Sequence, residues 1–170
     1  MKNIKLAVWI AVILILQTVL CKYIKILGIF PNIAFAFVIS VCVLDDGFAP
    51  AVAVSSICGA LLDALVNRSV GMYTIMFSYS AILCHAAVEK FFKPGVLMTF
   101  VATGISYCIC NMIYMLFGFS GYYETGLARI ILHIILPSAA YTAAISAIIC
   151  FLLKHTIYRN SSDITQGGVL

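Results

Sequence analysis

Six long apolar runs occupy most of this 170-residue chain, with only short polar breaks between them. The runs cover residues 6–21, 26–44, 48–66, 70–88, 95–118 and 130–153. A helix that crosses a membrane needs about 20 mostly apolar residues in sequence. Because the runs do not alternate polar and apolar residues, helices are favoured over the strands of a membrane barrel. The pattern predicts an all-α, polytopic integral membrane protein that forms a six-helix transmembrane bundle.

Composition excludes a soluble domain. Hydrophobic residues make up 64% of the chain and charged residues 9%, whereas a soluble domain carries roughly 25% charged residues. Residues 1–158 are therefore predicted to form one integral membrane helical domain, followed by a polar, disordered cytoplasmic tail at 159–170. The net charge of +4 is spread over the span ends. This placement suits contact with a lipid bilayer and supplies no basic patch for nucleic acid.

The second apolar run is the weakest candidate for a span. Pro31 lies inside it and would break or kink a helix there. The spanning part then shrinks to residues 32–44, which is short for a bilayer. This segment is expected to be a short span with little tilt or to lie partly in the membrane interface. Five spans are therefore the alternative count.

The distribution of basic residues predicts the orientation of the chain. Lys and Arg are enriched in cytoplasmic segments. If the N-terminus lies inside, six basic residues fall on the cytoplasmic side and four on the outer side. We therefore expect a multi-pass membrane protein with both termini in the cytoplasm.

The residues that could carry chemistry do not form a reactive pattern. All seven cysteines fall in or beside apolar runs, and there is no Cys-x-x-Cys pair. We interpret them as small buried hydrophobic residues, with neither a metal site nor a cofactor. The sequence contains no recognisable nucleophile–base pair and no phosphate-binding loop. We therefore expect no catalytic residue, and a protein that is not an enzyme.

Small side chains form a stripe along the third run. Ala51, Ser55, Gly59 and Asp63 follow one another at intervals of four residues, so they share one face of a helix. Small residues allow close contact between helices in a membrane. The stripe either packs against another helix of the same bundle or docks the span of a partner protein. Packing within the bundle is the commoner outcome.

Asp63 ends this stripe with a carboxylate. A charged group near hydrocarbon needs a partner or water. Arg68 could pair with it, or the free N–H groups at the start of the fourth helix, near residues 69–71, could bind it. Asp63 is accordingly expected either to fix the tight connection between the third and fourth helices or to belong to a polar site.

Polar residues gather on the side of the membrane opposite the N-terminus. We call them the outer polar set: Gln17, Asn32, Asp63, Arg68, Asn111, Arg129 and His133. Such residues either line a cavity that opens outward or form hydrogen bonds that tie helix ends together. The second arrangement is the commoner one.

Three short motifs resemble those of a known family. Pro31-Asn32 opens the short second span, Gly59 and Asp63 end the third, and Val70-Gly71 leads into the fourth. The order and spacing of these motifs over residues 26–85 resemble the MreD family of rod-shape-determining membrane proteins. The chain departs from that pattern at residues 45–47, Asp-Asp-Gly, where basic or Arg-Pro-like loops are frequent in the family.

The resemblance implies a non-enzymatic scaffold of the bacterial elongasome in the cytoplasmic membrane. It further implies binding to the membrane span of an MreC-like protein, and coupling of the MreB filament to cell-wall synthases. The MreD family is also similar in fold to the substrate-binding subunits of energy-coupling-factor vitamin transporters. In that alternative function, a ligand pocket would be lined by Gln17, Asp63, Asn111, Arg129 and His133.

Overall fold

The computed structural model describes residues 2–19, 31–45, 47–66, 71–91, 95–118 and 131–158. Within these ranges every regular element is a helix, which confirms the all-α prediction. The six α-helices are α1 (Lys2–Val19), α2 (Ile33–Leu44), α3 (Phe48–Val66), α4 (Met72–Phe91), α5 (Val96–Gly118) and α7 (Leu136–Leu153). Two π-helical segments, η3 (Ile131–Ile135) and η4 (Lys154–Tyr158), extend α7 at its two ends.

Three of the described helical segments are long and apolar enough to cross a membrane: Phe48–Leu65, Val96–Ile113 and Ile131–Ile157. Three further apolar helical stretches are shorter: Ile4–Val19, Ile33–Leu44 and Met72–Val88. The outer surface of the bundle is also apolar, since Ile75 is 68% exposed and Leu97 is 78% exposed. An extended apolar surface of this kind suits hydrocarbon and not water.

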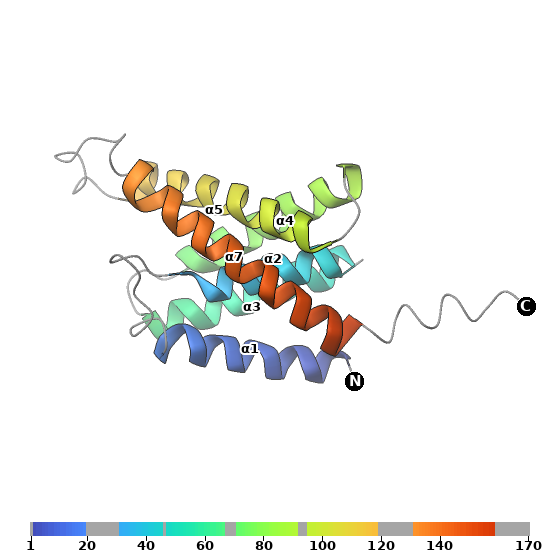
Figure 1. Ribbon diagram of the computed structural model, residues 1–170. Helices are drawn as coiled ribbons and strands as arrows, with labels where there is room; N and C mark the ends of the chain where they lie inside the picture. Colours follow the sequence, from blue (N-terminus) through green and yellow to red (C-terminus); the bar gives the residue numbers. More distant parts are fainter. Residues whose placement is uncertain are drawn as a thin grey trace, which may run out of the picture.

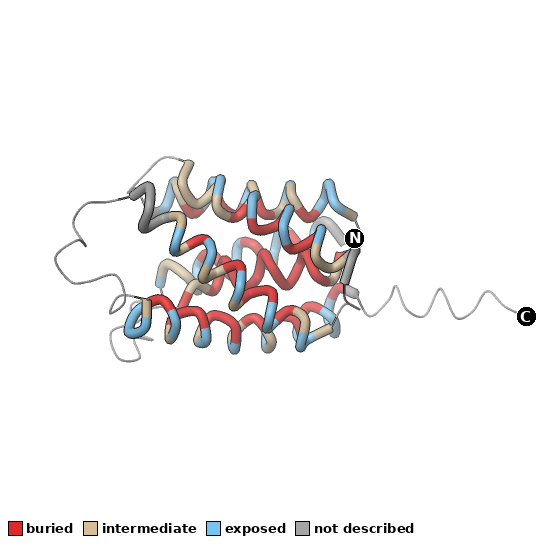
Figure 2. Tube along the Cα trace, turned by 90° about the horizontal axis from the view of Figure 1, so that it is seen from above, coloured by how far each residue is buried: buried red, intermediate tan, exposed pale blue. Residues whose placement is uncertain are grey.

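Helix α2 lies at the centre of the bundle and contacts α1, α3, α4, α5 and α7 (Figure 1). Every residue from Ile33 to Val43 is buried, and the buried parts of the tube in Figure 2 run through the middle of the bundle. A helix that is apolar on all sides belongs in such a core. With 12 residues it is about 18 Å long, little more than half of a hydrocarbon layer of about 30 Å. The structure therefore places this short segment in the core of the bundle, among the other helices.

The helices alternate in direction, which gives the bundle two distinct ends. At the Lys5 end, Lys5 Nζ donates a hydrogen bond to the carbonyl oxygen of Thr156 at 3.2 Å. At the Asn32 end, Gln17 of α1 bonds to the first residue of α2, Ile33. Helices α1, α3 and α5 thus begin at the Lys5 end, whereas α2, α4 and α7 begin at the Asn32 end (Figure 1).

The π-helical segment η3 has a local cause. Pro137 lies in the first turn of α7. Proline has no N–H to donate, and its ring clashes with the carbonyl group four residues earlier, which here belongs to His133. Wider π-helical hydrogen bonding over Ile131–Ile135 allows the chain to remain helical up to the proline. The result is one long helical segment, from Ile131 to Ile157, that is apolar enough to cross a membrane.

Candidate functional site

The start of α2 is held by side chains from neighbouring segments of the chain. Asn32 caps the helix, because its Oδ1 accepts the N–H of Phe35 at 3.0 Å. Gln17 of α1 accepts two more N–H groups with its Oε1, from Ile33 at 2.7 Å and from Ala34 at 3.3 Å. A helix start leaves its N–H groups without acceptors inside the helix. Here Gln17, a polar residue of a different helix, supplies an acceptor.

Thr142 of α7 completes this cap. The N–H of Asn32 donates to Thr142 Oγ1 at 3.2 Å, and Thr142 is fully buried. All four N–H groups of residues 32–35 therefore have side-chain acceptors. This helix start joins α1, α2 and α7 and leaves no free backbone donor for an anion.

Asp63 makes the second set of hydrogen bonds that joins two helices at the Asn32 end, and we call each such set a joint. Its carboxylate accepts the N–H of Tyr73 at 3.0 Å, the N–H of Thr74 at 3.0 Å and the hydroxyl group of Thr74 at 2.7 Å. A negative charge at a helix N-terminus is stabilised by the helix dipole. Of the two interpretations from the sequence, the structure places Asp63 at the connection between α3 and α4. Arg68, the other proposed partner, lies outside the described residues.

Glycines make this joint possible. A Cβ atom on Gly59 would lie 2.6 Å from the Cα of Thr74 and 2.8 Å from the carbonyl oxygen of Tyr73, so the backbones of α3 and α4 touch there. Gly71 precedes α4 with a φ of +87°, a conformation that L side chains adopt at a cost. The Gly59–Asp63 motif and Gly71 therefore lie at the same contact, between the end of α3 and the start of α4.

The rest of the small-residue stripe is also buried inside the bundle. Ala51 and Ser55 are fully buried, and Ser55 Oγ donates to the carbonyl oxygen of Ala51 at 2.7 Å. The same hydroxyl lies 3.7 Å from the Sγ of Cys42 on α2. The stripe thus faces α2 at Ser55 and α4 at Gly59 and Asp63. Its small side chains are enclosed by this chain's own helices and offer no surface to a partner helix.

A small cavity of about 120 Å³ opens at the Asn32 end between α2, α4 and α5. It is lined by Asn32, Phe35, Tyr73, Met76, Phe77, Tyr107, Cys110 and Asn111. The ring of Phe35 meets those of Phe77 and Tyr107 edge to face, with centroids 5.5 Å apart in each pair. Pockets for small molecules usually measure about 300–1,000 Å³. A cavity of this size has room for a few water molecules, each of which takes about 30 Å³ in the liquid.

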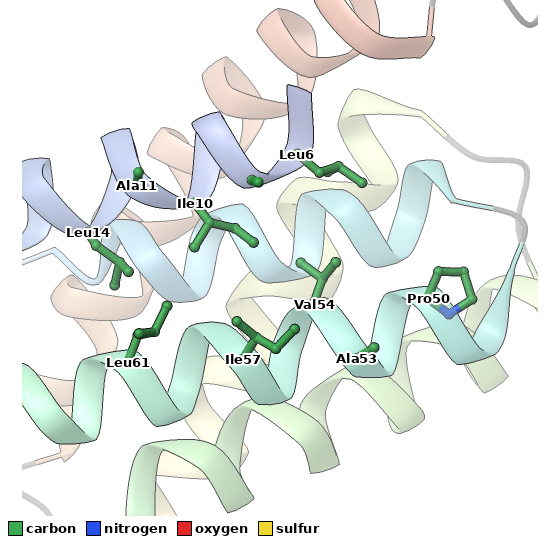
Figure 3. Close-up of a pocket in the computed structure, with 10 residues that line it drawn as sticks. Leu6, Ile10, Ala11, Leu14, Pro50, Ala53, Val54, Ile57 and Leu61 are labelled. Carbon is green, nitrogen blue, oxygen red and sulfur yellow. The ribbon is translucent and has the colours of Figure 1, made fainter. Parts of the chain in front are cut away.

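A larger groove of about 530 Å³ runs between α1 and α3 (Figure 3). We call it the α1–α3 groove; its lining is Leu6, Ala7, Ile10, Ala11, Leu14, Pro50, Ala53, Val54, Ile57 and Leu61. None of these side chains is polar. The alanines on both walls are exposed, and small side chains leave the space open. The sequence pattern does not reveal this groove, because it forms only where two non-consecutive helices lie side by side.

The outer polar set does not assemble around one ligand site. Gln17 and Asn32 meet at the start of α2, whereas Asp63 is bound to α4. Asn111 borders the small cavity and donates through Nδ2 to the carbonyl oxygen of Tyr107 at 2.8 Å. His133 is exposed in η3. Arg68 and Arg129 lie outside the described residues, as does the predicted tail at 159–170.

The described cysteines are free thiols. Cys42, Cys58, Cys84, Cys110 and Cys150 are buried, as predicted, and Cys108 is partly exposed. Cys21 falls outside the described part of the chain. Among the described residues, no group of three or more His, Cys, Asp or Glu side chains is placed to hold a metal ion.

Comparison of the chain with protein-family models, with curated proteins and with solved structures finds no match.

Proposed function

We propose that the chain is a six-span protein of the bacterial cytoplasmic membrane with both termini in the cytoplasm. Three long apolar helical segments, three shorter ones and an apolar outer surface support this proposal. Helix α2 would lie in the membrane as a half-length helix that the other five shield from lipid. Irregular backbone at membrane depth is tolerated where protein covers it.

We propose that its function is that of a non-enzymatic scaffold of the cell-shape machinery, as the resemblance to MreD implies. The supporting observation is that the motif residues act as joints between helices. Asn32 and Asp63 cap α2 and α4, while Gly59 and Gly71 allow α3 and α4 to meet closely. Their polar groups are used to hold a defined bundle shape. A membrane span of an MreC-like protein would pack against the exposed apolar faces of this bundle, linking it to the MreB filament and the cell-wall synthases.

The second candidate is a substrate-binding subunit of an energy-coupling-factor transporter. The small cavity favours it, because aromatic rings and amide groups meet there. Two observations favour the scaffold instead. The cavity, at about 120 Å³, is well below the roughly 300 Å³ at which ligand pockets begin. The side-chain oxygens of Gln17 and Asp63 already accept hydrogen bonds within the bundle.

Depletion of the protein in its rod-shaped host, followed by imaging of the cells, tests the proposal. A scaffold of the elongasome predicts conversion from rods to spheres, reversed by the wild-type gene. The tagged protein should also co-purify from membranes with an MreC-like single-span protein. Unchanged cell shape together with a defect in vitamin uptake would overturn the scaffold in favour of the transporter subunit.

A further inference from the structure

The α1–α3 groove has the length of one membrane leaflet. Its longer wall follows residues 50–61 of α3, which span about 16 Å along a helix axis. This is about half of a hydrocarbon core of about 30 Å. A partner helix would cross both leaflets, whereas a lipid acyl chain extends through one. The dimensions therefore favour an acyl chain.

One mouth of the groove lies beside exposed positive charge. Leu6 and Pro50 line the groove at the Lys5 end (Figure 3). Lys5 directly precedes Leu6 and is exposed, and its hydrogen bond to the carbonyl oxygen of Thr156 uses one of the three ammonium protons. This bond brings α1 next to η4, which begins with the exposed Lys154. Two exposed cationic side chains thus lie at this end of the bundle, and Lys5 is next to the groove.

The structure describes one of the two acidic residues between α2 and α3. Asp45 follows α2 at the Lys5 end and is only 7% exposed, whereas Asp46 lies outside the described residues. The Oδ1 of Asp45 accepts the N–H of Gly47 at 3.2 Å, so this oxygen is bound by the backbone of the turn. Among the described residues at this end, the exposed charge of Lys5 and Lys154 therefore complements an anionic headgroup.

We propose that the α1–α3 groove binds one acyl chain of an anionic phospholipid, with its phosphate near Lys5 and Lys154. Ala7 and Ala11 on α1 and Ala53 on α3 leave the space that the chain fills. Basic residues close to a membrane surface attract anionic lipids, each by a factor of about five in affinity. This site requires only that the protein lies in a membrane and does not depend on the scaffold function.

Native mass spectrometry of the purified, delipidated full-length protein tests the site. The probes are phosphatidylglycerol and phosphatidylethanolamine with identical acyl chains. We expect one phosphatidylglycerol to remain bound, at least fivefold in preference to phosphatidylethanolamine. Ala11→Phe places a ring in the groove and should remove most of the bound lipid. Ala144→Phe makes the same change at an exposed alanine of α7 and should leave binding intact.

Charge variants test the headgroup contact separately. Lys154→Gln should lower the preference for phosphatidylglycerol about fivefold. Lys5→Gln should do the same, and Lys5→Arg should keep the preference. Equal retention of the two lipids by the wild-type protein would overturn the proposal, as would unchanged binding in Ala11→Phe. A dimer that Ala11→Phe dissociates would also overturn it, because a second copy would then occupy the groove.

Discussion

Replacing Gly59 with alanine adds one methyl group at the closest contact between α3 and α4. The new Cβ would lie 2.6 Å from the Cα of Thr74 and 2.8 Å from its nitrogen. Both contacts are with backbone, which cannot rotate away as a side chain can. To reach an ordinary separation of 3.4 Å, α4 must move back by about 0.8 Å at this point.

That displacement acts directly on the joint made by Asp63. Its 3.0 Å bonds to the N–H groups of Tyr73 and Thr74 would lengthen to about 3.8 Å, beyond hydrogen-bonding distance. Loss of these two hydrogen bonds to a charged group costs about 3–6 kcal/mol, at about 1.5–3 kcal/mol each, and overpacking adds about 1–3 kcal/mol. The higher helix propensity of alanine returns up to about 1 kcal/mol. We expect Gly59→Ala to lower the free energy of unfolding by at least about 3 kcal/mol.

Unfolding of the purified protein by sodium dodecyl sulphate in detergent micelles measures this change, with the single tryptophan, Trp9, and circular dichroism as probes. Gly104→Ala on α5 is the matched control. A Cβ there would meet only the Cβ of Ala143, at 3.9 Å, which is an ordinary contact. The control should be as stable as the wild type or more stable by up to about 1 kcal/mol.

Amide hydrogen exchange adds a local readout. Faster exchange in Gly59→Ala should be concentrated at Tyr73 and Thr74, whose N–H groups are the ones released from Asp63. If Gly59→Ala and Gly104→Ala unfold at the same detergent concentration, the close contact between α3 and α4 does not limit stability.

Other changes test the remaining joints by the same unfolding assay. Asp63→Asn keeps one acceptor oxygen but loses the charge, and should cost about 1–3 kcal/mol and speed amide exchange at the start of α4. Gln17→Leu leaves two N–H groups of α2 without an acceptor and should cost about 1–3 kcal/mol. Its control is Thr18→Val, since Thr18 bonds, among the residues that the structure describes, only to carbonyl groups of its own helix, and this change should be nearly neutral. Gly71→Ala forces a side chain into a left-handed conformation and should cost about 1–2 kcal/mol, whereas Gly71→Asn should cost less. Equal stability of Gln17→Leu and Thr18→Val, or of the two Gly71 variants, would contradict these assignments.

Local sequence signals located most of the helices well. The run at 48–66 coincides with α3, and the run at 95–118 differs from α5 by one residue. In both cases charged or turn residues border the run, and these signals act over a few residues. Pro31-Asn32 likewise marked the start of α2, because proline ends helical hydrogen bonding and asparagine caps a helix.

The position of α2 within the bundle could not be read in the same way. Its apolar residues are equally compatible with lipid, with the membrane interface and with a protein core. Burial by five other helices is decided by residues far away in the sequence. Thr142, which accepts the N–H of Asn32, lies 110 residues further along the chain.

The candidate site was predictable only in part. The start of the fourth helix was one of two partners expected for Asp63, beside Arg68, because that helix follows directly and offers free N–H groups. No comparable sequence signal predicts the hydrogen bonds that Gln17 accepts from α2, since nothing in the local sequence indicates which helix a glutamine will face. The α1–α3 groove depends on a pairing of non-consecutive helices, which periodicity alone does not encode.

The enclosed position of α2 has a consequence for biogenesis. Its 12 residues are too few to be retained as an independent membrane anchor, and one of the acceptors for its first N–H groups belongs to α7, which is synthesised after all the other described α-helices. The ribosome must therefore deliver α7 before the centre of the protein can reach its final arrangement. In the proposed six-span arrangement, the start of α2 lacks one of its backbone acceptors until then, so a chain that ends before α7 would be a substrate for membrane quality-control proteases.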